Sequence, residues 1–158
     1  MRELILLRHA HAESVSAGQA DLDRPLSPEG LAEAEAAGRW LAEQGLVPDC
    51  VLCSPARRTR ETLEAVLGQV GYVDQRLDDD VYEASPGTLA ALVDRHRAVD
   101  RLLVVGHNPG LERLVALMHS GQSGDYRGMP PGGIAVLSLP KEGEIEPGIA
   151  TLSAFWWP

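Results

Sequence analysis

Residues 4–11 read LILLRHAH, in which four apolar side chains are followed directly by Arg8 and His9. A short apolar run that stops at a polar loop is typical of a buried parallel strand. Residues 102–110 repeat this pattern as LLVVGHNPG, with His107 just after the apolar run. In open α/β sheets, ligands bind beyond the carboxyl ends of such strands. We therefore expect the two histidines to face one crevice.

The composition is that of a globular protein and argues against several functions. The length of 158 residues and the 44% hydrophobic content suit a single domain over residues 1–158. The formal net charge of −9 argues against nucleic-acid binding, which depends on Lys and Arg neutralising phosphates. No segment resembles a signal peptide or has the roughly 20 apolar residues that a membrane span needs. We expect a cytoplasmic protein with neither nucleic-acid nor membrane partners.

Cys50 and Cys53 have the spacing of a redox C-x-x-C pair but lie in a strand-like run. Side chains three positions apart in a strand point to opposite faces, with Cα atoms about 10 Å apart. This distance is too long for a disulfide. We expect two packed thiols in a reducing compartment.

The chain alternates strand-like runs with helix starts. Four dipeptides carry the cap-and-proline signal of a helix N-terminus: Ser27-Pro28, Ser54-Pro55, Ser85-Pro86 and Asn108-Pro109. The apolar runs are Leu4–Leu7, Cys50–Cys53, Leu102–Val105, Ile134–Leu139, Ile149–Ala154 and a weaker one near Val73–Leu77. Such alternation predicts a three-layer α/β/α fold with a mainly parallel sheet. The last two runs are joined by a linker too short for a crossover helix, which predicts an antiparallel hairpin at the sheet edge. Residues 120–133 are rich in Gly and Pro, and we expect a mobile loop there.

Cationic side chains gather at three of the predicted junctions between strand and helix. Arg8 ends the first strand, and a helix N-terminus, which favours negative charge, follows His107. Arg57 and Arg58 fall in the first turn of another helix, where the helix dipole disfavours cations. This placement indicates that an anion occupies the site.

Five segments together resemble the histidine phosphatase superfamily, which has the phosphoglycerate-mutase-like fold. They are Arg8-His9-Ala10, Arg24–Gly30, Ser54–Thr62, Tyr82-Glu83-Ala84 and Gly106–Pro109. All occur in family order, and together they cover nearly the whole chain. Within the superfamily the chain is most similar to the small bacterial phosphohistidine phosphatases of the SixA type.

The resemblance implies a role for each matching residue. His9 would be the nucleophile that becomes phosphorylated, and Arg8, Arg58 and His107 would hold the phosphoryl oxygens. Arg58 is preferred over Arg57 because of its spacing from the preceding strand. Glu83 would be the proton donor. In one departure from the family pattern, Ala10 stands where glycine is usual, and its methyl group could crowd the loop.

The residue types suit phosphoryl transfer without a metal. A neutral imidazole is a competent nucleophile, and transfer needs mainly positioning and charge neutralisation. Two arginines and a protonated histidine supply that charge, so we expect no metal and no cofactor. Two weaker alternatives are a metal pair at His9 and His11, and a cation site at Asp78-Asp79-Asp80 rather than a solvated turn.

We predict a phosphohistidine phosphatase that acts on a phosphorylated protein. The alternatives are a small-molecule phosphomonoesterase or mutase of the same superfamily, and a non-catalytic phosphate-binding module. The intervals between the motifs leave no room for an insertion that would form a lid over a small substrate. An open pocket suits a protruding protein side chain.

Overall fold

The computed structural model describes residues 1–158 and contains a six-stranded sheet in the order β3-β2-β4-β1-β5-β6. The strands are β1 (Glu3–Arg8), β2 (Cys50–Cys53), β3 (Asp74–Leu77), β4 (Arg101–Gly106), β5 (Ile134–Ser138) and β6 (Thr151–Trp156). The first four strands are parallel, whereas β5 is antiparallel to β1 and β6 is antiparallel to β5. This confirms the mainly parallel sheet with an antiparallel hairpin at one edge.

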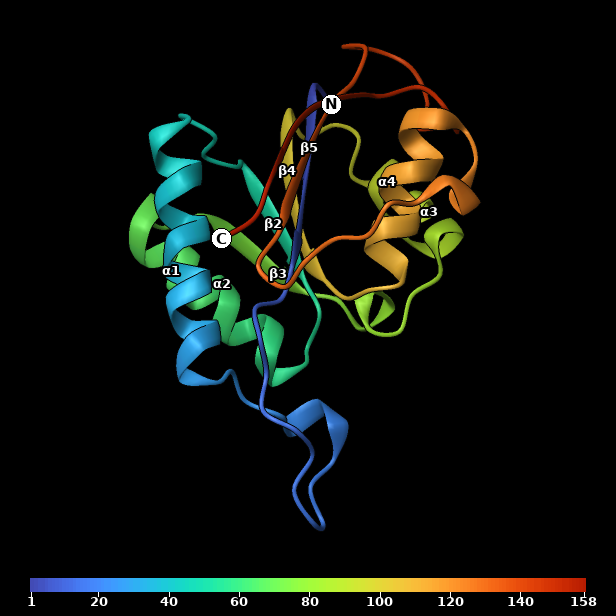
Figure 1. Ribbon diagram of the computed structural model, residues 1–158. Coiled ribbons are helices and arrows are strands. Elements are labelled where there is room, and N and C mark those ends of the chain that lie inside the picture. The colour runs from blue at the N-terminus through green and yellow to red at the C-terminus, as the bar shows by residue number, and fades with distance from the viewer.

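Four helices cover the sheet and complete three layers (Figure 1). One face carries α1 (Pro28–Glu43) and α2 (Arg57–Val70), and the other carries α3 (Pro86–Arg95) and α4 (Gly110–Ser120). The segment between β1 and α1 extends away from the edge of the sheet where β1 ends (Figure 1). None of the helices combines the length and hydrophobicity that crossing a bilayer requires.

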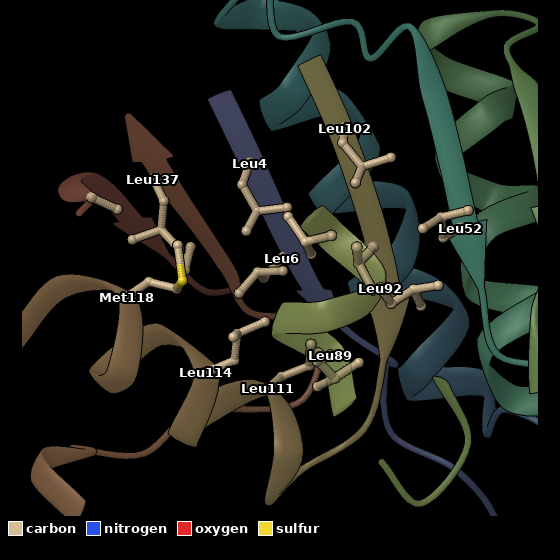
Figure 2. Packing of buried hydrophobic residues seen from close by; sticks show 14 of the residues in the cluster. Leu4, Leu6, Leu52, Leu89, Leu92, Leu102, Leu111, Leu114, Met118 and Leu137 are labelled. Atoms are coloured by element: carbon tan, nitrogen blue, oxygen red, sulfur yellow. The ribbon is translucent and has the colours of Figure 1, made fainter. Parts of the chain in front are cut away.

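Alternate residues of the strands fill two separate cores. Leu4 and Leu6 belong to a cluster of 18 buried residues and point toward leucines of α3 and α4 (Figure 2). Ile5 and Leu7 belong to a second cluster of 13 buried residues beneath α1 and α2. Each such side chain contributes roughly 1.5–3 kcal/mol when fully buried. Because β1 is buried on both faces, its position in the sheet fixes where the residues after it emerge.

Two of the four expected helix caps are confirmed. The Ser27 hydroxyl accepts a hydrogen bond from the third residue after it, and the Ser85 hydroxyl does the same. The cap expected at Ser54 is wrong, because α2 begins two residues later than expected and has no side-chain cap. The Ser54 hydroxyl accepts a 3.3 Å hydrogen bond from the Ala56 amide just before α2 and lies 2.7 Å from Nε2 of His107.

The chain between α4 and β5 is anchored at Met129. Met129 is buried, and its carbonyl accepts hydrogen bonds of 2.9 Å from both Arg8 and Asn108. Asn108, the expected cap of α4, accepts a hydrogen bond from the Glu112 amide, while α4 itself begins at Gly110. The Met129 segment therefore forms part of the wall beside the end of β1.

Cys50 and Cys53 are both free and buried. Cys50 packs in the core beneath α3 and α4, and Cys53 packs in the core on the other face. Burial raises the pKa of both thiols, that of Cys53 to about 12. The interpretation as two packed thiols on opposite faces is confirmed.

Candidate functional site

All five of the expected site residues line one cavity of about 590 Å³: Arg8, His9, Arg58, Glu83 and His107. The cavity lies at the carboxyl ends of the parallel strands, where β1 delivers His9 and β4 delivers His107. The two imidazole rings are 5.3 Å apart between centroids. The expectation that both histidines face one crevice is confirmed.

His9 is held in a defined orientation. Its Nδ1 lies 2.7 Å from the carbonyl oxygen of Ala10, so Nδ1 carries the proton and donates it to that oxygen. The lone pair is consequently on Nε2. The pKa of His9 is lowered to about 4, chiefly by burial; the charges of Arg58 and Arg8 also lower it, and the Ala10 hydrogen bond opposes them. The ring is therefore neutral near pH 7, as a nucleophile requires.

A buried threonine ties the His9 loop to α2. The amide of Ala10 donates to Oγ1 of Thr62 at 3.1 Å, and this hydroxyl donates to the carbonyl of Arg58 at 2.7 Å. Ala10 is fully buried, so its methyl group fits into the space where the family usually has glycine. Thr62 thereby fixes the His9 loop relative to the helix that carries Arg58.

The phase of α2 separates its two neighbouring arginines. The Arg58 side chain is 7% exposed and turns into the cavity, where Nη1 donates to the Asp21 carbonyl at 2.8 Å and Nη2 donates to Oδ2 of Asp21 at 3.0 Å. Arg57 is exposed and pairs with Glu61 at 3.2 Å. The structure thus places Arg58, and not Arg57, at the site.

Asp21 is a cavity residue that the sequence did not point to. Besides Arg58, its carboxylate accepts a 2.6 Å hydrogen bond from the Tyr82 hydroxyl and a 3.1 Å hydrogen bond from Arg24. The Tyr82 hydrogen bond, together with the two arginines, holds the pKa of Asp21 well below its usual value. The same contact raises the pKa of Tyr82 to about 12. The one signal available was that Asp21 lies three residues before the recognised segment beginning at Arg24.

His107 is neutral near pH 7 in these surroundings alone, and the expected protonated form needs an anion beside it. Burial lowers its pKa to about 3, with further contributions from His9 and Arg58. Nε2 lies 2.7 Å from the Ser54 hydroxyl, and the ring meets that of Tyr82 edge-on at 5.5 Å. A cation at this depth among arginines is disfavoured unless an anion accompanies it.

Three buried nitrogens of the site have no hydrogen-bond partner in the protein: Nε of Arg8, Nε of Arg58 and Nδ1 of His107. Buried polar atoms are normally paired, and each unpaired one costs about 1–3 kcal/mol. Two of the three belong to cations. The cluster therefore has an excess of positive charge and donors, an environment that favours an anion.

Glu83 lies at the mouth of the cavity on strained backbone. Its φ of 55° is in the left-handed region, which costs a residue other than glycine about 1–3 kcal/mol and is concentrated at functional sites. The following residue, Ala84, packs closely on Gly110, where an added Cβ would lie 2.4 Å from the Ala84 carbonyl oxygen. The start of α4 therefore fixes the loop that presents Glu83 to the cavity.

No group of three or more His, Cys, Asp or Glu side chains is arranged to hold a metal ion. His11 is engaged in another contact, since its Nδ1 lies 2.7 Å from the Ser27 hydroxyl. Asp78, Asp79 and Asp80 lie in and before a short 3₁₀ turn, where Asp78 caps the amide of Asp80. The donors that do converge in the cavity are those of an anion site.

Comparison with known proteins agrees with this geometry. The model of the histidine phosphatase superfamily (branch 1) matches residues 4–102, a span that contains His9 and Arg58 and ends before His107. An uncharacterized protein found in two strains of Mycobacterium tuberculosis is 37% identical over 96% of this chain and 99% of its own length.

Solved structures share the whole architecture. SixA of Agrobacterium tumefaciens superposes with a TM-score of 0.86 and 31% identity over 99% of this chain and 98% of that one. A protein histidine phosphatase SixA complexed with tungstate has the same fold, with a TM-score of 0.85 and 24% identity over 98% of this chain and 96% of that one. The chain belongs to the histidine phosphatase superfamily.

Proposed function

We propose that this protein is a phosphohistidine phosphatase that acts on a phosphorylated protein through a phosphohistidine intermediate on His9. The observation that carries the proposal is the orientation of His9, whose free Nε2 shares one cavity with Arg8, Arg58 and His107. We propose further that residues 1–158 work as one catalytic domain. The cytoplasmic location remains a prediction.

In the first step, the lone pair on Nε2 of His9 attacks phosphorus. A P–N bond forms to His9 as the bond from phosphorus to the leaving group of the substrate breaks, and its electron pair stays with the leaving group. Arg8 and Arg58 stabilise the charge on the three phosphoryl oxygens. The hydrogen bond from Nδ1 to the Ala10 carbonyl grows stronger as His9 gains positive character.

In the second step, a water molecule attacks the phosphorus of phosphorylated His9. The P–N bond breaks, its electron pair returns to Nε2, and inorganic phosphate is released. We assign the proton transfers to Glu83, which would protonate the leaving group in the first step and accept a proton from water in the second. Its position at the cavity mouth leaves it within reach of solvent for proton exchange.

The open form of the site supports this substrate class. Between Tyr82 and β4 the chain forms only a loop and the ten residues of α3, and no inserted subdomain covers the cavity. A phosphorylated side chain on a protein surface can enter such a site directly. A small phosphomonoester would be held by few contacts beyond its phosphate, and it remains the second candidate because Glu83 offers a proton donor for an alkoxide leaving group.

The test is to trap the intermediate and compare neighbouring arginines. The enzyme is mixed with a labile phosphodonor and quenched, and mass spectrometry should locate phosphate on the peptide that contains His9. His9→Ala should abolish turnover while leaving the fold intact. Arg58→Ala should lower kcat/KM by about 10²–10³, the effect of losing one electrostatic stabiliser, whereas Arg57→Ala serves as its matched control and should change little. Phosphate found on another residue, or equal losses at both arginines, would contradict the assignment.

Metal independence and the role of Glu83 need separate assays. Turnover in EDTA should equal turnover without it, and a requirement for added metal would refute the purely cationic pocket. Glu83→Gln should slow hydrolysis of phosphoserine far more than that of phosphohistidine or p-nitrophenyl phosphate, whose leaving groups need less protonation. A uniform loss across the three substrates, or none, would remove Glu83 from the catalytic residues.

A further inference from the structure

Two further cavities adjoin the catalytic one along α4. The first, of about 530 Å³, shares Arg8 and Asn108 with the catalytic cavity and is also lined by Arg127 and Trp157. The second, of about 780 Å³, shares Arg127 and Phe155 with the first. The two cavities form a surface that starts at the catalytic residues, and we call it the α4 groove.

The far part of the α4 groove lies between α4, the turn after it and β6. Its apolar lining comes from Val115 of α4, Leu152 and Phe155 of β6, and Tyr126 of the turn. Tyr126 is 43% exposed and Trp157 is 57% exposed. The groove holds three of only seven aromatic residues in the chain, and exposed aromatic side chains are enriched where proteins bind one another.

The groove also carries an unpaired cation. Arg127 takes part in none of the ion pairs of the protein, all of which involve other arginines. Of the carboxylates that line the groove, Glu112 accepts a hydrogen bond from Asn108 and Asp125 accepts one from Ser120, and neither pairs with Arg127. In a chain of net charge −9, an exposed arginine between aromatic side chains suits a ligand with both a carboxylate and an apolar group.

We propose that the α4 groove binds the polypeptide that flanks the phosphohistidine of the substrate, with an apolar side chain against Tyr126 and Phe155 and a carboxylate beside Arg127. This inference rests on the proposed function. The occupant follows from continuity, because a chain whose phosphorylated side chain reaches His9 can pass Arg8 and Asn108, which line both cavities, directly into the groove. From Gly110 to Val115 and His119, α4 rises about 8–14 Å. An extended polypeptide covers that distance in about two to four residues.

The test uses phosphohistidine peptides that differ only in their flanks. One set carries Leu and Glu two to four residues from the phosphohistidine, on either side, and the other carries Ser and Lys at the same positions. Wild-type kcat/KM should be about two- to fivefold higher for the Leu/Glu set on one side, the scale of one exposed ion pair. Hydrolysis of p-nitrophenyl phosphate, which is too small to reach the groove, provides the reference activity.

The variants separate docking from catalysis. Arg127→Glu should remove or reverse the preference for Leu/Glu flanks and leave p-nitrophenyl phosphate hydrolysis within about twofold. Arg39→Glu, the same charge reversal on the exposed face of α1, should keep the preference. Trp157→Ala provides a second groove variant and should lower kcat/KM for the Leu/Glu peptides by about fivefold or more, the scale of a side chain that anchors an interface.

Each outcome bears on a different claim. Equal turnover of both peptide sets, or equal effects of the reversals at Arg127 and Arg39, would overturn the docking proposal and leave the proposed function standing. Hydrolysis of p-nitrophenyl phosphate without turnover of any phosphohistidine peptide would overturn the proposed function and the docking proposal with it.

Discussion

Binding of a dianion in the catalytic cavity is expected to draw one proton onto the His9–His107 pair. The pKa of His107 is about 3 and that of His9 about 4, chiefly because both rings are buried. Both imidazoles are therefore neutral near pH 7. A doubly charged anion beside them opposes the field of the arginines and favours an imidazolium.

The magnitudes favour one proton for the pair. Protonating His9 or His107 at pH 7 requires a rise of its pKa by about three or four units, which costs about 4–5.5 kcal/mol. A dianion about 5 Å from an imidazolium contributes about 7 kcal/mol at an effective dielectric constant of about 20. The rings are 5.3 Å apart, and a second imidazolium would be opposed by about 3 kcal/mol of repulsion from the first. The first protonation is therefore favourable, and the repulsion between the rings opposes the second.

Isothermal titration calorimetry can count this proton. Sulfate is the suitable probe because it has no titratable proton near pH 7, so any uptake belongs to the protein. Titrations in two buffers of different ionisation enthalpy should give an uptake of about one proton per bound sulfate. The double variant His9→Gln/His107→Gln should show none, while His119→Gln, outside the cavity, should match the wild type. Stoichiometric sulfate binding with an uptake below about 0.2 proton would refute the electrostatic reasoning.

Three further changes have definite expected outcomes. Asp21→Asn should lower kcat about tenfold, because charge-assisted hydrogen bonds are about 1–2 kcal/mol stronger than neutral ones, and it should make phosphate a tighter-binding inhibitor. Steady-state kinetics measure both effects beside the control variant Asp23→Asn, and equal effects of the two substitutions would contradict the reasoning. Gly30→Ala should lower the free energy of unfolding by about 1–3 kcal/mol, because the added Cβ would lie 1.9 Å from the His11 carbonyl oxygen. An unchanged urea midpoint of unfolding would contradict this expected clash. The pKa of His9 falls from 6.5 to about 4 on folding, so the unfolded state binds the proton more readily and the free energy of unfolding decreases as pH falls between these values. His9→Gln should therefore make Tm less dependent on pH in this range. A variant whose Tm depends on pH as steeply as that of the wild type would rule out this contribution of His9.

The central strands were predictable because their signal is local. β2 has the expected bounds, and β1 and β4 each extend one residue further at both ends. β6 begins two residues later than expected, at Thr151. The apolar residues before it, Ile149 and Ala150, pack on the α3–α4 core instead of joining the sheet. An apolar run indicates that a segment is buried, but burial alone does not distinguish a strand from a loop that packs on the core.

The site was predictable where residues follow strand ends, and not where loops supply them. His9 and His107 come directly after buried strands, so chain order already placed them together. Asp21 reaches Tyr82 across 61 residues of sequence, and no local pattern announces such a contact. Ser54 misled for a related reason, since its hydroxyl contacts His107 and the Ala56 amide rather than an amide within α2. A cap signal describes one possible partner, and the tertiary structure selected another.

The charge of the cavity explains how an acidic protein can attract a phosphoryl dianion. Four arginines and two carboxylates line it, which gives a formal charge of +2 in a chain of −9: Arg8, Arg24, Arg58 and Arg113, with Asp21 and Glu83. Asp21 lets Arg58 remain buried by pairing with it, while the unpaired Nε atoms show that the pairing is incomplete. A bound dianion balances the remaining charge, and low dielectric surroundings strengthen that attraction relative to water. Since Asp21 also holds Arg24 and Tyr82, its carboxylate sets the positions of the cations as well as their net charge. For this reason the loop before α1, which carries no predicted catalytic residue, belongs to the working site.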